Sequence, residues 1–297
     1  MSGDMEKDFA VTAAYARADA NPAPSAIFVQ ITDPHIREPG RLAYGRLDTA
    51  PYLRAAVAAI GSLPQAPQAV VITGDLSDFG RAEEYAHLAS LIAPLAMPVY
   101  LLPGNHDTRT GLRAGFPGHA YLGTDGPVHY AVDIGALRLL ALDTSVPGKS
   151  HGELDEAQLR WLDTELMRCA GRPAVIAMHH PPFATLIGHM DKIGLLAGAA
   201  ELERIVARHA HVERIICGHV HRPIERRFGG TVASVCPSPA HQVCLDLQPD
   251  AVSAWILEPP AFRVHALDPD GHLVSHLAPI GRFDGPHPFH ENGKLID

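Results

Sequence analysis

Apolar runs of strand length alternate with segments of helical periodicity along the N-terminal third of the chain. Three such runs occupy residues 26–31, 69–73 and 98–102, and each has the length and composition of a buried strand. Apolar side chains recur at helical spacing in residues 48–63 and 81–95, which lie between these runs. This β-α-β-α-β order predicts a parallel sheet covered by helices, with functional residues in the loops that follow the strands.

The pattern continues through the middle of the chain and then changes. The same periodicities predict, in order, a hairpin, a helix, a strand, a helix and a strand at residues 129–143, 155–170, 174–178, 199–210 and 214–217. The remainder contains several short strand-like runs, which predict a second and more antiparallel sheet. The chain is therefore expected to fold as an α/β protein.

Composition and charge narrow the possible functions. A chain of 297 residues with 46% hydrophobic and 19% charged residues can bury a full core as one large domain. Its net charge of −9 argues against a nucleic-acid polymer as partner, since proteins that bind one usually present a basic face. The sequence has no apolar run of about 18 residues, so no membrane span is expected.

The N-terminus and the cysteines bear on location. Residues 1–24 lack the basic start and the unbroken apolar run of a signal peptide, and they are interpreted as a mobile or docking arm. The cysteines show no CxxC spacing and are interpreted as reduced, buried thiols: Cys169, Cys217, Cys236 and Cys244. Together these features predict a cytoplasmic protein.

Five polar clusters follow apolar runs at the points where strands are expected to end. They are Asp33-Pro34-His35, Gly74-Asp75, Gly104-Asn105-His106-Asp107, His179-His180 and Gly218-His219-Val220-His221. In a parallel sheet, all five would gather along one edge. The pairs Asp33/His35 and His219/His221 have i,i+2 spacing, which in an extended segment points both side chains to one side.

Each cluster has an ordinary structural explanation when it is taken alone. A single His after a strand is usually a surface or core residue, and a Gly-Asp pair is most often a turn. Five clusters in order, all built from Asp, Asn and His, favour a metal centre instead.

These clusters match the motifs of a known family. With D-x-H, G-D, G-N-H-[DE], H and G-H-x-H in order, the sequence resembles the calcineurin-like metallophosphoesterases. Within that family it is most similar to the bacterial class III cyclic-nucleotide phosphodiesterases and glycerophosphodiesterases. The supporting segments are ITDPH, YGRLD, GDLSDFG, EEY, LPGNHD, MHHPP, MD at 190–191, CGHVH and HQV at 241–243.

The resemblance covers roughly residues 25–285 and implies a fold. That fold is a four-layer α/β/β/α sandwich of two mixed sheets flanked by helices. Residues 25–245 would then form the catalytic domain. Residues 246–297 would add strands and a tail that complete the second sheet or form an oligomer interface.

The resemblance also implies a ligand set for two metal ions, and it assigns each ligand to an ion. One ion would be held by Asp33, His35, Asp75 and His221, and the other by Asp75, Asn105, His179 and His219, with Asp75 bridging. Mixed nitrogen and oxygen donors suit Mn²⁺, Fe, Co²⁺ or Zn²⁺ better than Mg²⁺ or Ca²⁺. The expected cofactors are therefore two divalent ions of that group.

The neighbouring Asn105 and His106 are expected to divide the chemistry between them. Asn105 offers a neutral oxygen, so it would bind an ion without cancelling its charge. His106 would face the substrate, where it would stabilise a phosphoryl oxygen or protonate the leaving alkoxide. Asp78 is the candidate to hydrogen-bond His106 and keep it cationic, as a dyad in this family does. Asp107 is a rival for that role, or it caps the loop.

The candidate substrate contacts are Asn105, His106 and four residues of other segments. Arg37 and Tyr44 lie in the segment HIREPGRLAYGRLD, and the alternative for both is a solvated loop position. The other two, His189 and His241, resemble family positions that line the pocket, although each is equally compatible with a structural role. His180, next to a predicted ligand, is either a supporting residue or part of the core.

The function that this site predicts is hydrolysis of a small phosphodiester by in-line attack of a metal-bridging hydroxide. Candidate substrates are 3′,5′-cyclic nucleotides, glycerophosphodiesters and similar diesters. A phosphomonoesterase or nucleotidase with the same metal core is the enzymatic alternative. A non-catalytic metal-binding scaffold is the alternative outside enzymes, and the complete set of ligand-type residues argues against it. A homo-oligomer, dimeric or larger, is expected by analogy with the family.

Overall fold

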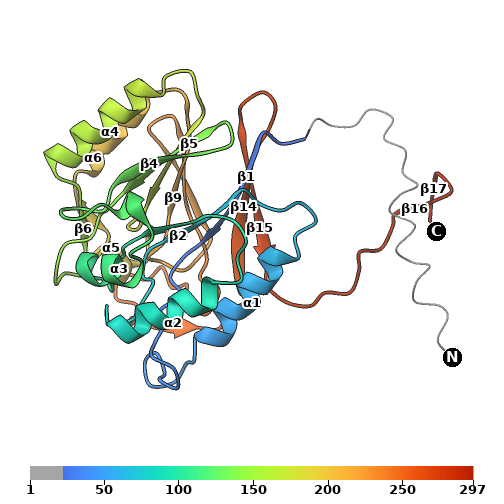
Figure 1. Cartoon of the computed structure of the whole chain (residues 1–297), viewed down its shortest axis with the longest axis horizontal. Helices are drawn as coiled ribbons and strands as arrows, with labels where there is room; N and C mark the ends of the chain where they lie inside the picture. Colours follow the sequence, from blue (N-terminus) through green and yellow to red (C-terminus); the bar gives the residue numbers. More distant parts are fainter. Residues whose placement is uncertain (1–22, 297) are drawn as a thin grey trace.

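Two mixed β-sheets packed against each other form the centre of the molecule (Figure 1). The computed structural model describes residues 23–296, so nearly all of the predicted N-terminal arm lies outside the described residues. Apolar side chains of both sheets share one buried cluster, in which Val29 and Val71 accompany Leu139 and Ile216. The main core therefore lies between the two sheets, as expected for a sandwich.

The first sheet contains the parallel β-α-β-α-β unit predicted from the sequence. Its five strands, in spatial order, are β15 (Leu273–Pro279), β14 (Ala261–Leu267), β1 (Ala26–Ile31), β2 (Ala69–Thr73) and β3 (Val99–Leu102). The strands β1, β2 and β3 run parallel to one another. β1 and β2 are buried along their whole length, which explains their nearly continuous apolar sequences.

The C-terminal strands do not complete the second sheet, so this part of the prediction for residues 246–297 is wrong. β14 pairs antiparallel with β1, and β15 pairs antiparallel with β14, so both strands extend the first sheet. The physical reason is burial: β14 places Phe262 and Leu267 in the main core, on the side of β1 that β2 leaves free. Strand pattern alone could not choose between the two sheets.

The second sheet has six strands and combines a parallel centre with antiparallel edges. In spatial order they are β10 (Ile224–Phe228), β11 (Thr231–Val235), β9 (Val212–Cys217), β7 (Ala174–Met178), β5 (Leu137–Leu142) and β4 (Tyr130–Ile134). β4 and β5 form the predicted hairpin, and β5, β7, β9 and β11 run parallel. Both sheets are therefore mixed.

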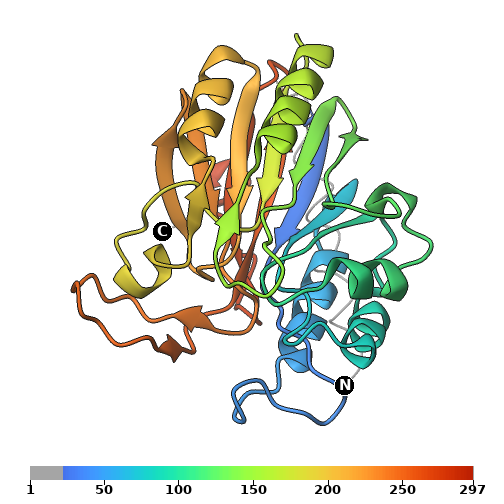
Figure 2. The ribbon, with the colours of Figure 1, turned by 90° about the vertical axis from the view of Figure 1, so that its left-hand side faces the viewer.

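Helices cover the outer face of each sheet and complete the four layers (Figure 2). The helices α1 (Ala50–Gly61), α2 (Ala82–Ile92) and α3 (Arg109–Gly115) lie on the first sheet, and α4 (Glu156–Arg168) and α6 (Ala199–Arg208) lie on the second. The Asp155 side chain begins α4 by accepting a 2.8 Å hydrogen bond from the Gln158 amide. Leu159, Leu162 and Leu166 of α4 pack into a second core on the outer face of that sheet. The predicted α/β/β/α architecture is confirmed.

Short elements complete the chain. They are α5 (Gly188–Asp191), the 3₁₀ turn η2 (Ala120–Leu122), and the two-stranded ladders β6 (Gly152–Glu153) with β8 (Leu195–Ala197), β12 (Gln242–Val243) with β13 (Trp255–Ile256), and β16 (His290–Glu291) with β17 (Lys294–Leu295). Within residues 23–296, no helix combines the length and the apolar character needed to cross a bilayer.

Candidate metal centre and active site

The ligands expected from the sequence lie together where strands of both sheets end. Asp33 and His35 follow β1, Asp75 follows β2, Asn105 follows β3, His179 follows β7, and His219 and His221 follow β9. The pattern of apolar runs predicted a single sheet edge, but these strands belong to two sheets. The side chains still converge, because the ends of the strands meet across the sandwich.

The backbone at these positions is not extended, which corrects the i,i+2 argument. The φ angles are 52° at Asp33, 44° at His35, 46° at Asp75, 72° at His219 and 57° at His221. A residue with a side chain costs about 1–3 kcal/mol in this left-handed region, and such residues cluster at functional sites. Sharp left-handed turns, rather than strand alternation, therefore bring each pair of side chains together.

The first half-site consists of Asp33, His35, Asp75 and His221. His35 Nε2 lies 3.3 Å from His221 Nε2 and 3.5 Å from Asp75 Oδ2, and His221 Nε2 lies 3.3 Å from Asp33 Oδ1. One donor atom from each residue falls within 4.8 Å of all the others. Two imidazole nitrogens at this separation require a proton or a cation between their lone pairs, so the donor set fits a metal ion.

The second half-site consists of Asp75, Asn105, His179 and His219. His179 Nε2 lies 3.4 Å from Asp75 Oδ2 and 3.2 Å from Asn105 Oδ1. The same oxygen of Asp75 thus lies near His35 of the first half-site and His179 of the second. His219 Nε2 is buried and has no hydrogen-bond partner, which is costly unless a cation binds it.

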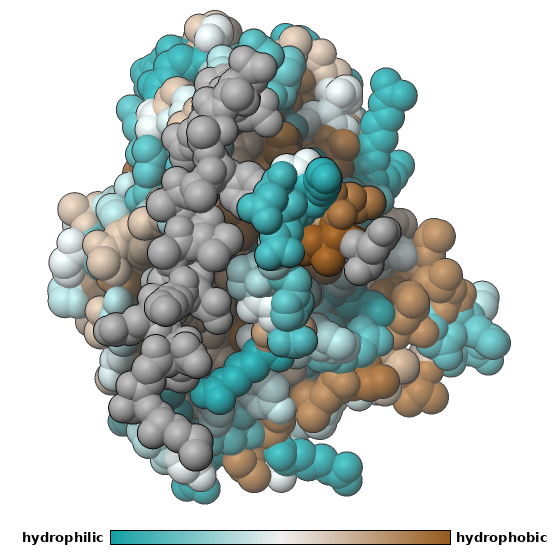
Figure 3. Space-filling view, turned by 90° about the vertical axis from the view of Figure 1, so that its right-hand side faces the viewer, coloured by the Kyte–Doolittle hydropathy of each residue, from teal (hydrophilic) through white to brown (hydrophobic). Residues whose placement is uncertain are grey.

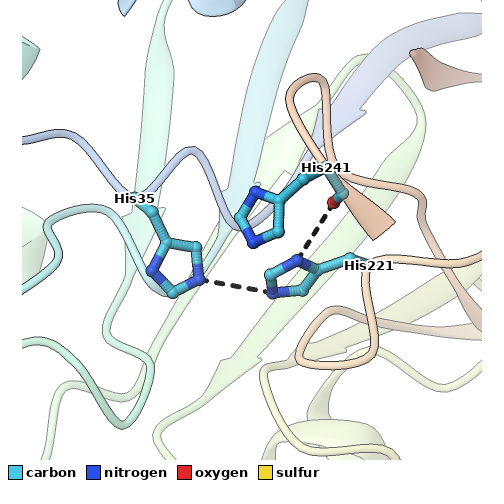
Figure 4. A group of neighbouring side chains, drawn as sticks. All are labelled: His35, His221 and His241. Carbon is cyan, nitrogen blue, oxygen red and sulfur yellow. Dashed lines mark hydrogen bonds between the residues drawn. The ribbon is translucent and has the colours of Figure 1, made fainter. Parts of the chain in front are cut away.

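Nearby oxygen atoms hydrogen-bond to Nδ1 of three of the histidines and so orient Nε2 of each ring toward the site. Nδ1 of His35 lies 3.2 Å from Asp78 Oδ1, Nδ1 of His179 lies 2.8 Å from the Thr73 carbonyl, and Nδ1 of His221 lies 3.1 Å from the His241 carbonyl. Figure 4 shows His35 and His221 facing each other through their Nε2 atoms. Partners of this kind fix the Nδ1–H tautomer and free Nε2 as a ligand, which is how metal-binding histidines are usually oriented.

The carboxylates of the site favour positive charge close to them. Burial lowers the pKa of His179, but the carboxylates of Asp75 and Asp33 outweigh it and raise the pKa to about 9. Burial also raises the pKa of Asp75, but the nearby His179, His106 and His35 hold it well below its usual value. Burial lowers the pKa of His219 to about 3, so this side chain is neutral and free to act as a ligand.

Glycines in the motifs allow the loops to approach one another closely. A Cβ on Gly104 would collide with the Asp75 carboxylate, and a Cβ on Gly218 would collide with the Thr32 hydroxyl. Thr32 in turn donates a 2.6 Å hydrogen bond to Asp33 Oδ2. These motif glycines are therefore needed for space around the carboxylates.

His106 lies at the rim of the site. Its predicted partner Asp78 contacts it through the backbone carbonyl and not through the carboxylate. Nδ1 of His106 donates a 2.8 Å hydrogen bond to the backbone carbonyl of Asp78, whereas the Asp78 carboxylate is 3.8 Å away. That carboxylate instead accepts from His35 and pairs with Arg37 at 3.3 Å. Burial lowers the pKa of His106, but Asp75 and Asp78 outweigh it and raise the pKa above its usual value.

Asp107 organises the loop rather than contacting His106. Its carboxylate accepts hydrogen bonds of 2.9–3.1 Å from the backbone amides of Leu76, Ser77 and Gly104, and from the Tyr85 hydroxyl. Burial and the neighbouring Asp75 charge raise its pKa to about 6. These contacts correspond to the loop-capping alternative.

A cavity of about 370 Å³ opens beside the two half-sites. Asn105, His106, Tyr44, His189 and His241, all of them candidate substrate contacts, line it. The Tyr44 hydroxyl and His241 Nε2 lie 3.1 Å apart.

Two other residues with open roles lie elsewhere. Arg37 pairs with Asp78, Glu38 and Glu84 at 3.1–3.3 Å, and its guanidinium is held behind the site by these carboxylates. His180 is buried behind the ligands, where Nδ1 lies 2.8 Å from the Thr144 hydroxyl and Nε2 lies 3.2 Å from the Ser150 carbonyl. Because both ring nitrogens are occupied, its position is that of a supporting residue.

The cavity also contains residues that were not among the candidate substrate contacts. They are Ser150, Met190, Ile193, Ser253, Ala254 and Trp255, with Val243 beside His241. Trp255 lies in VSAWIL, where an aromatic residue reads as an ordinary strand position. Its role depends on the pairing of β13 with β12, which a single sequence does not reveal.

A two-sheet sandwich with Asp, Asn and His side chains gathered at its strand ends defines the class of the metallophosphoesterases. The family model for the calcineurin-like phosphoesterases matches residues 27–223, and the chain belongs to this family.

Curated relatives and solved structures are similar over most of the chain. A protein of Arcobacter nitrofigilis named "Probable glycerophosphodiester phosphodiesterase" is 35% identical over 91% of this chain and 100% of the relative. A "Probable cyclic nucleotide phosphodiesterase" of Rhodopseudomonas palustris is 36% identical over 87% of this chain and 94% of the relative. A dimetal phosphatase from Danio rerio has the same fold, with a TM-score of 0.63 at 17% identity over 87% of this chain and 100% of the phosphatase.

Proposed function

We propose that this protein is a metal-dependent phosphodiesterase that hydrolyses small phosphodiesters, with 3′,5′-cyclic nucleotides and glycerophosphodiesters as candidate substrates. The observation that carries the proposal is the pair of half-sites that share the Asp75 carboxylate, with His106 on the wall of the same cavity. The two named relatives carry diesterase names, which supports a diester over a monoester.

Two divalent cations would be held by Asp33, His35, Asp75 and His221 and by Asp75, Asn105, His179 and His219. When bound, they would acidify a water molecule and neutralise the charge on the phosphate oxygens. The imidazole donors favour Mn²⁺, Fe, Co²⁺ or Zn²⁺ over Mg²⁺ and Ca²⁺. We infer that the neutral Asn105 makes the ligand set of the second half-site less negative than that of the first.

His106 would act as the general acid. Its Nδ1–H is held by the Asp78 carbonyl, so the ring cannot turn freely and Nε2 is the nitrogen available to the substrate. Its raised pKa, caused by Asp75 and Asp78 against the opposing effect of burial, favours the imidazolium form. The imidazolium can donate the Nε2 proton to the leaving alkoxide, which otherwise departs as a strong base.

The test compares matched substrates on enzyme reconstituted with each candidate metal. We expect bis(p-nitrophenyl) phosphate to be cleaved faster than p-nitrophenyl phosphate, and at least one of cyclic AMP and glycerophosphoethanolamine to be cleaved. A faster rate on the monoester would instead identify a phosphatase or nucleotidase. Metal binding without turnover of any ester would identify a scaffold.

A homo-oligomer in the cytoplasm is part of the same proposal. The edge strand β15 exposes Val274 (45%) and Leu277 (47%), and the segment after it exposes Phe289 (81%). Figure 3, which views the molecule from that side, shows apolar patches among hydrophilic ones. Apolar groups on a sheet edge and on an extended segment suit contact with a second copy. Buried free thiols such as Cys217 and Cys236 fit a reducing compartment.

A further inference from the structure

An aromatic wall lines the cavity next to His35 of the first half-site. Tyr44 and Trp255 are stacked with ring centroids 5.8 Å apart and an interplanar angle of 30°. The His241 ring meets both edge-on, at 5.2 Å from Tyr44 and 5.7 Å from Trp255. All three residues line the cavity that also contains His106.

The backbone holds this wall in place. Val243 pairs with Trp255 in the β12–β13 ladder, and the Cys244 amide donates a 2.9 Å hydrogen bond to the Ala254 carbonyl. The ladder therefore fixes Trp255 relative to His241, whose own carbonyl lies 3.1 Å from Nδ1 of His221. The aromatic wall is thus tied to the first half-site rather than carried on a free loop.

The wall has features of a binding surface. Tyr44 is 46% exposed although it stacks on Trp255. His241 is only 1% exposed, and its Nδ1 is buried with no hydrogen-bond partner. His189 on the cavity wall also has a buried Nδ1 without a partner. Because these two nitrogens are buried, a ligand with a flat apolar face would instead cover the exposed Tyr44.

The charges around the wall favour a neutral ring over a cationic headgroup as its ligand. Among the described residues that line the cavity, Asp75 is the one carboxylate, and both half-sites use it. The rest of the lining beside the wall is apolar or small, as in Met190, Ile193 and Val243. The carboxylates whose charges act on Tyr44 already pair with other groups: Asp75 with His35, Asp78 with Arg37 and Asp33 with His221. A quaternary ammonium would therefore find aromatic faces but no free counter-charge, whereas a neutral heteroaromatic ring needs none.

We propose that Trp255 and Tyr44 form a stacking site for the neutral aromatic substituent of the diester, such as the base of a cyclic nucleotide, and that Trp255 determines this specificity. The inference rests on the proposed phosphodiesterase function and names its preferred substrate class. The sequence alone did not distinguish between cyclic nucleotides and glycerophosphodiesters as substrates, and the wall favours cyclic nucleotides.

The kinetic test uses two cyclic diesters that differ only in the base: cyclic AMP and 1-deoxyribose 3′,5′-cyclic phosphate. Wild type should prefer cyclic AMP in kcat/KM, and Trp255→Ala should lower that preference about 5- to 150-fold, the effect of removing a stacking partner of a base. Trp255→Phe keeps an aromatic face and should retain most of the preference. An equal loss of kcat/KM on both substrates would show that Trp255 has only a structural role, and it would overturn the proposal.

A binding measurement tests the same point without turnover. The chain has two tryptophans, and the other, Trp161 in α4, packs on His129 in another part of the fold. In Trp161→Phe, Trp255 is the single tryptophan, and we expect AMP to quench its fluorescence while ribose 5-phosphate does not. Equal quenching by both ligands would contradict stacking.

Further arms of the experiment separate the possible failures. If the wild type hydrolyses no diester with any metal, the proposed function fails. If it hydrolyses diesters but shows no preference for cyclic AMP over the base-free diester, only the stacking site is wrong. A selective loss of glycerophosphocholine turnover in Trp255→Ala would show that the wall binds a cation instead.

Discussion

The two half-sites share Asp75 but differ in charge and in the way their ligands are held. The first contains a second carboxylate, Asp33, which accepts from the Thr32 hydroxyl and the His219 amide. The second has the neutral Asn105 in the corresponding place, and its His219 has an unpartnered Nε2. The first half-site is thus more negative and more fully supported.

This difference indicates a division of labour. Affinity for a cation rises with the number of charged ligands, so the first half-site should bind its ion more tightly. His106 donates a 2.9 Å hydrogen bond from its amide to Oδ1 of the shared Asp75, and its ring lies edge-on to His35 of the first half-site with ring centroids 4.7 Å apart. An ion at the second half-site would keep more of its charge for the substrate, because Asn105 is neutral. We therefore expect the first half-site to hold its ion firmly and the second to serve the reaction.

The largest effect is expected from Asp75→Asn, which removes the charge that both half-sites share. Changes to groups that support a metal ligand cost up to about 100-fold in metal affinity or activity. If each half-site loses about that much, turnover should fall on the order of 10⁴-fold. Bound metal, measured by mass spectrometry of the purified protein, should fall in parallel. Asp270→Asn, at an exposed turn, is the matched control and should retain both. An Asp75→Asn protein that keeps two ions would refute the shared carboxylate.

His106→Ala should lower turnover of cyclic AMP on the order of 10³-fold, within the range that general acid catalysis contributes. Because p-nitrophenolate leaves without a proton, the loss on bis(p-nitrophenyl) phosphate should be clearly smaller. Metal content should stay at the wild-type value, since His106 Nδ1 is held by a carbonyl and lies outside both half-sites. Loss of metal in this variant would place His106 among the ligands instead.

The fold and the gathering of the candidate ligands at strand ends were largely predictable because both depend on local sequence. Buried parallel strands have continuous apolar runs, as in AIFVQI of β1, and polar residues directly after them fall at the sheet edge. The ends of α1 and α4 also lie within a few residues of the predicted positions.

The missed features depend on long-range packing. The partner of the Asp78 carboxylate, the position of Arg37 and the wall at Trp255 arise where segments distant in sequence meet. The left-handed backbone of Asp33 and His35 is unfavourable locally, so no propensity rule would predict it. These strained positions are compensated by the surrounding structure, as is common at functional sites.

Staged metal removal tests the comparison directly. As chelator is added to the loaded enzyme, one equivalent should leave first, from the second half-site, and most activity should leave with it. Asn105→Asp adds a carboxylate to that half-site and should bring the two dissociation constants about tenfold closer. Calorimetric metal titration of wild type and variant measures both constants. Loss of both ions in one step, in wild type, would contradict the inequality of the half-sites.

The smallest effect is expected from Asp78→Asn, and it distinguishes between two ways of supporting the site. The Asp78 carboxylate accepts from His35 Nδ1, so losing its charge should weaken the first half-site by about 10-fold in metal affinity. His106 is held by the Asp78 backbone carbonyl, which the substitution leaves in place. At saturating metal, and at a pH low enough to keep His106 protonated in both proteins, turnover should therefore change little; metal titration and steady-state kinetics separate the two quantities. A large loss of turnover at unchanged metal affinity would mean that the carboxylate acts on His106, across the 3.8 Å that separates them, rather than on His35.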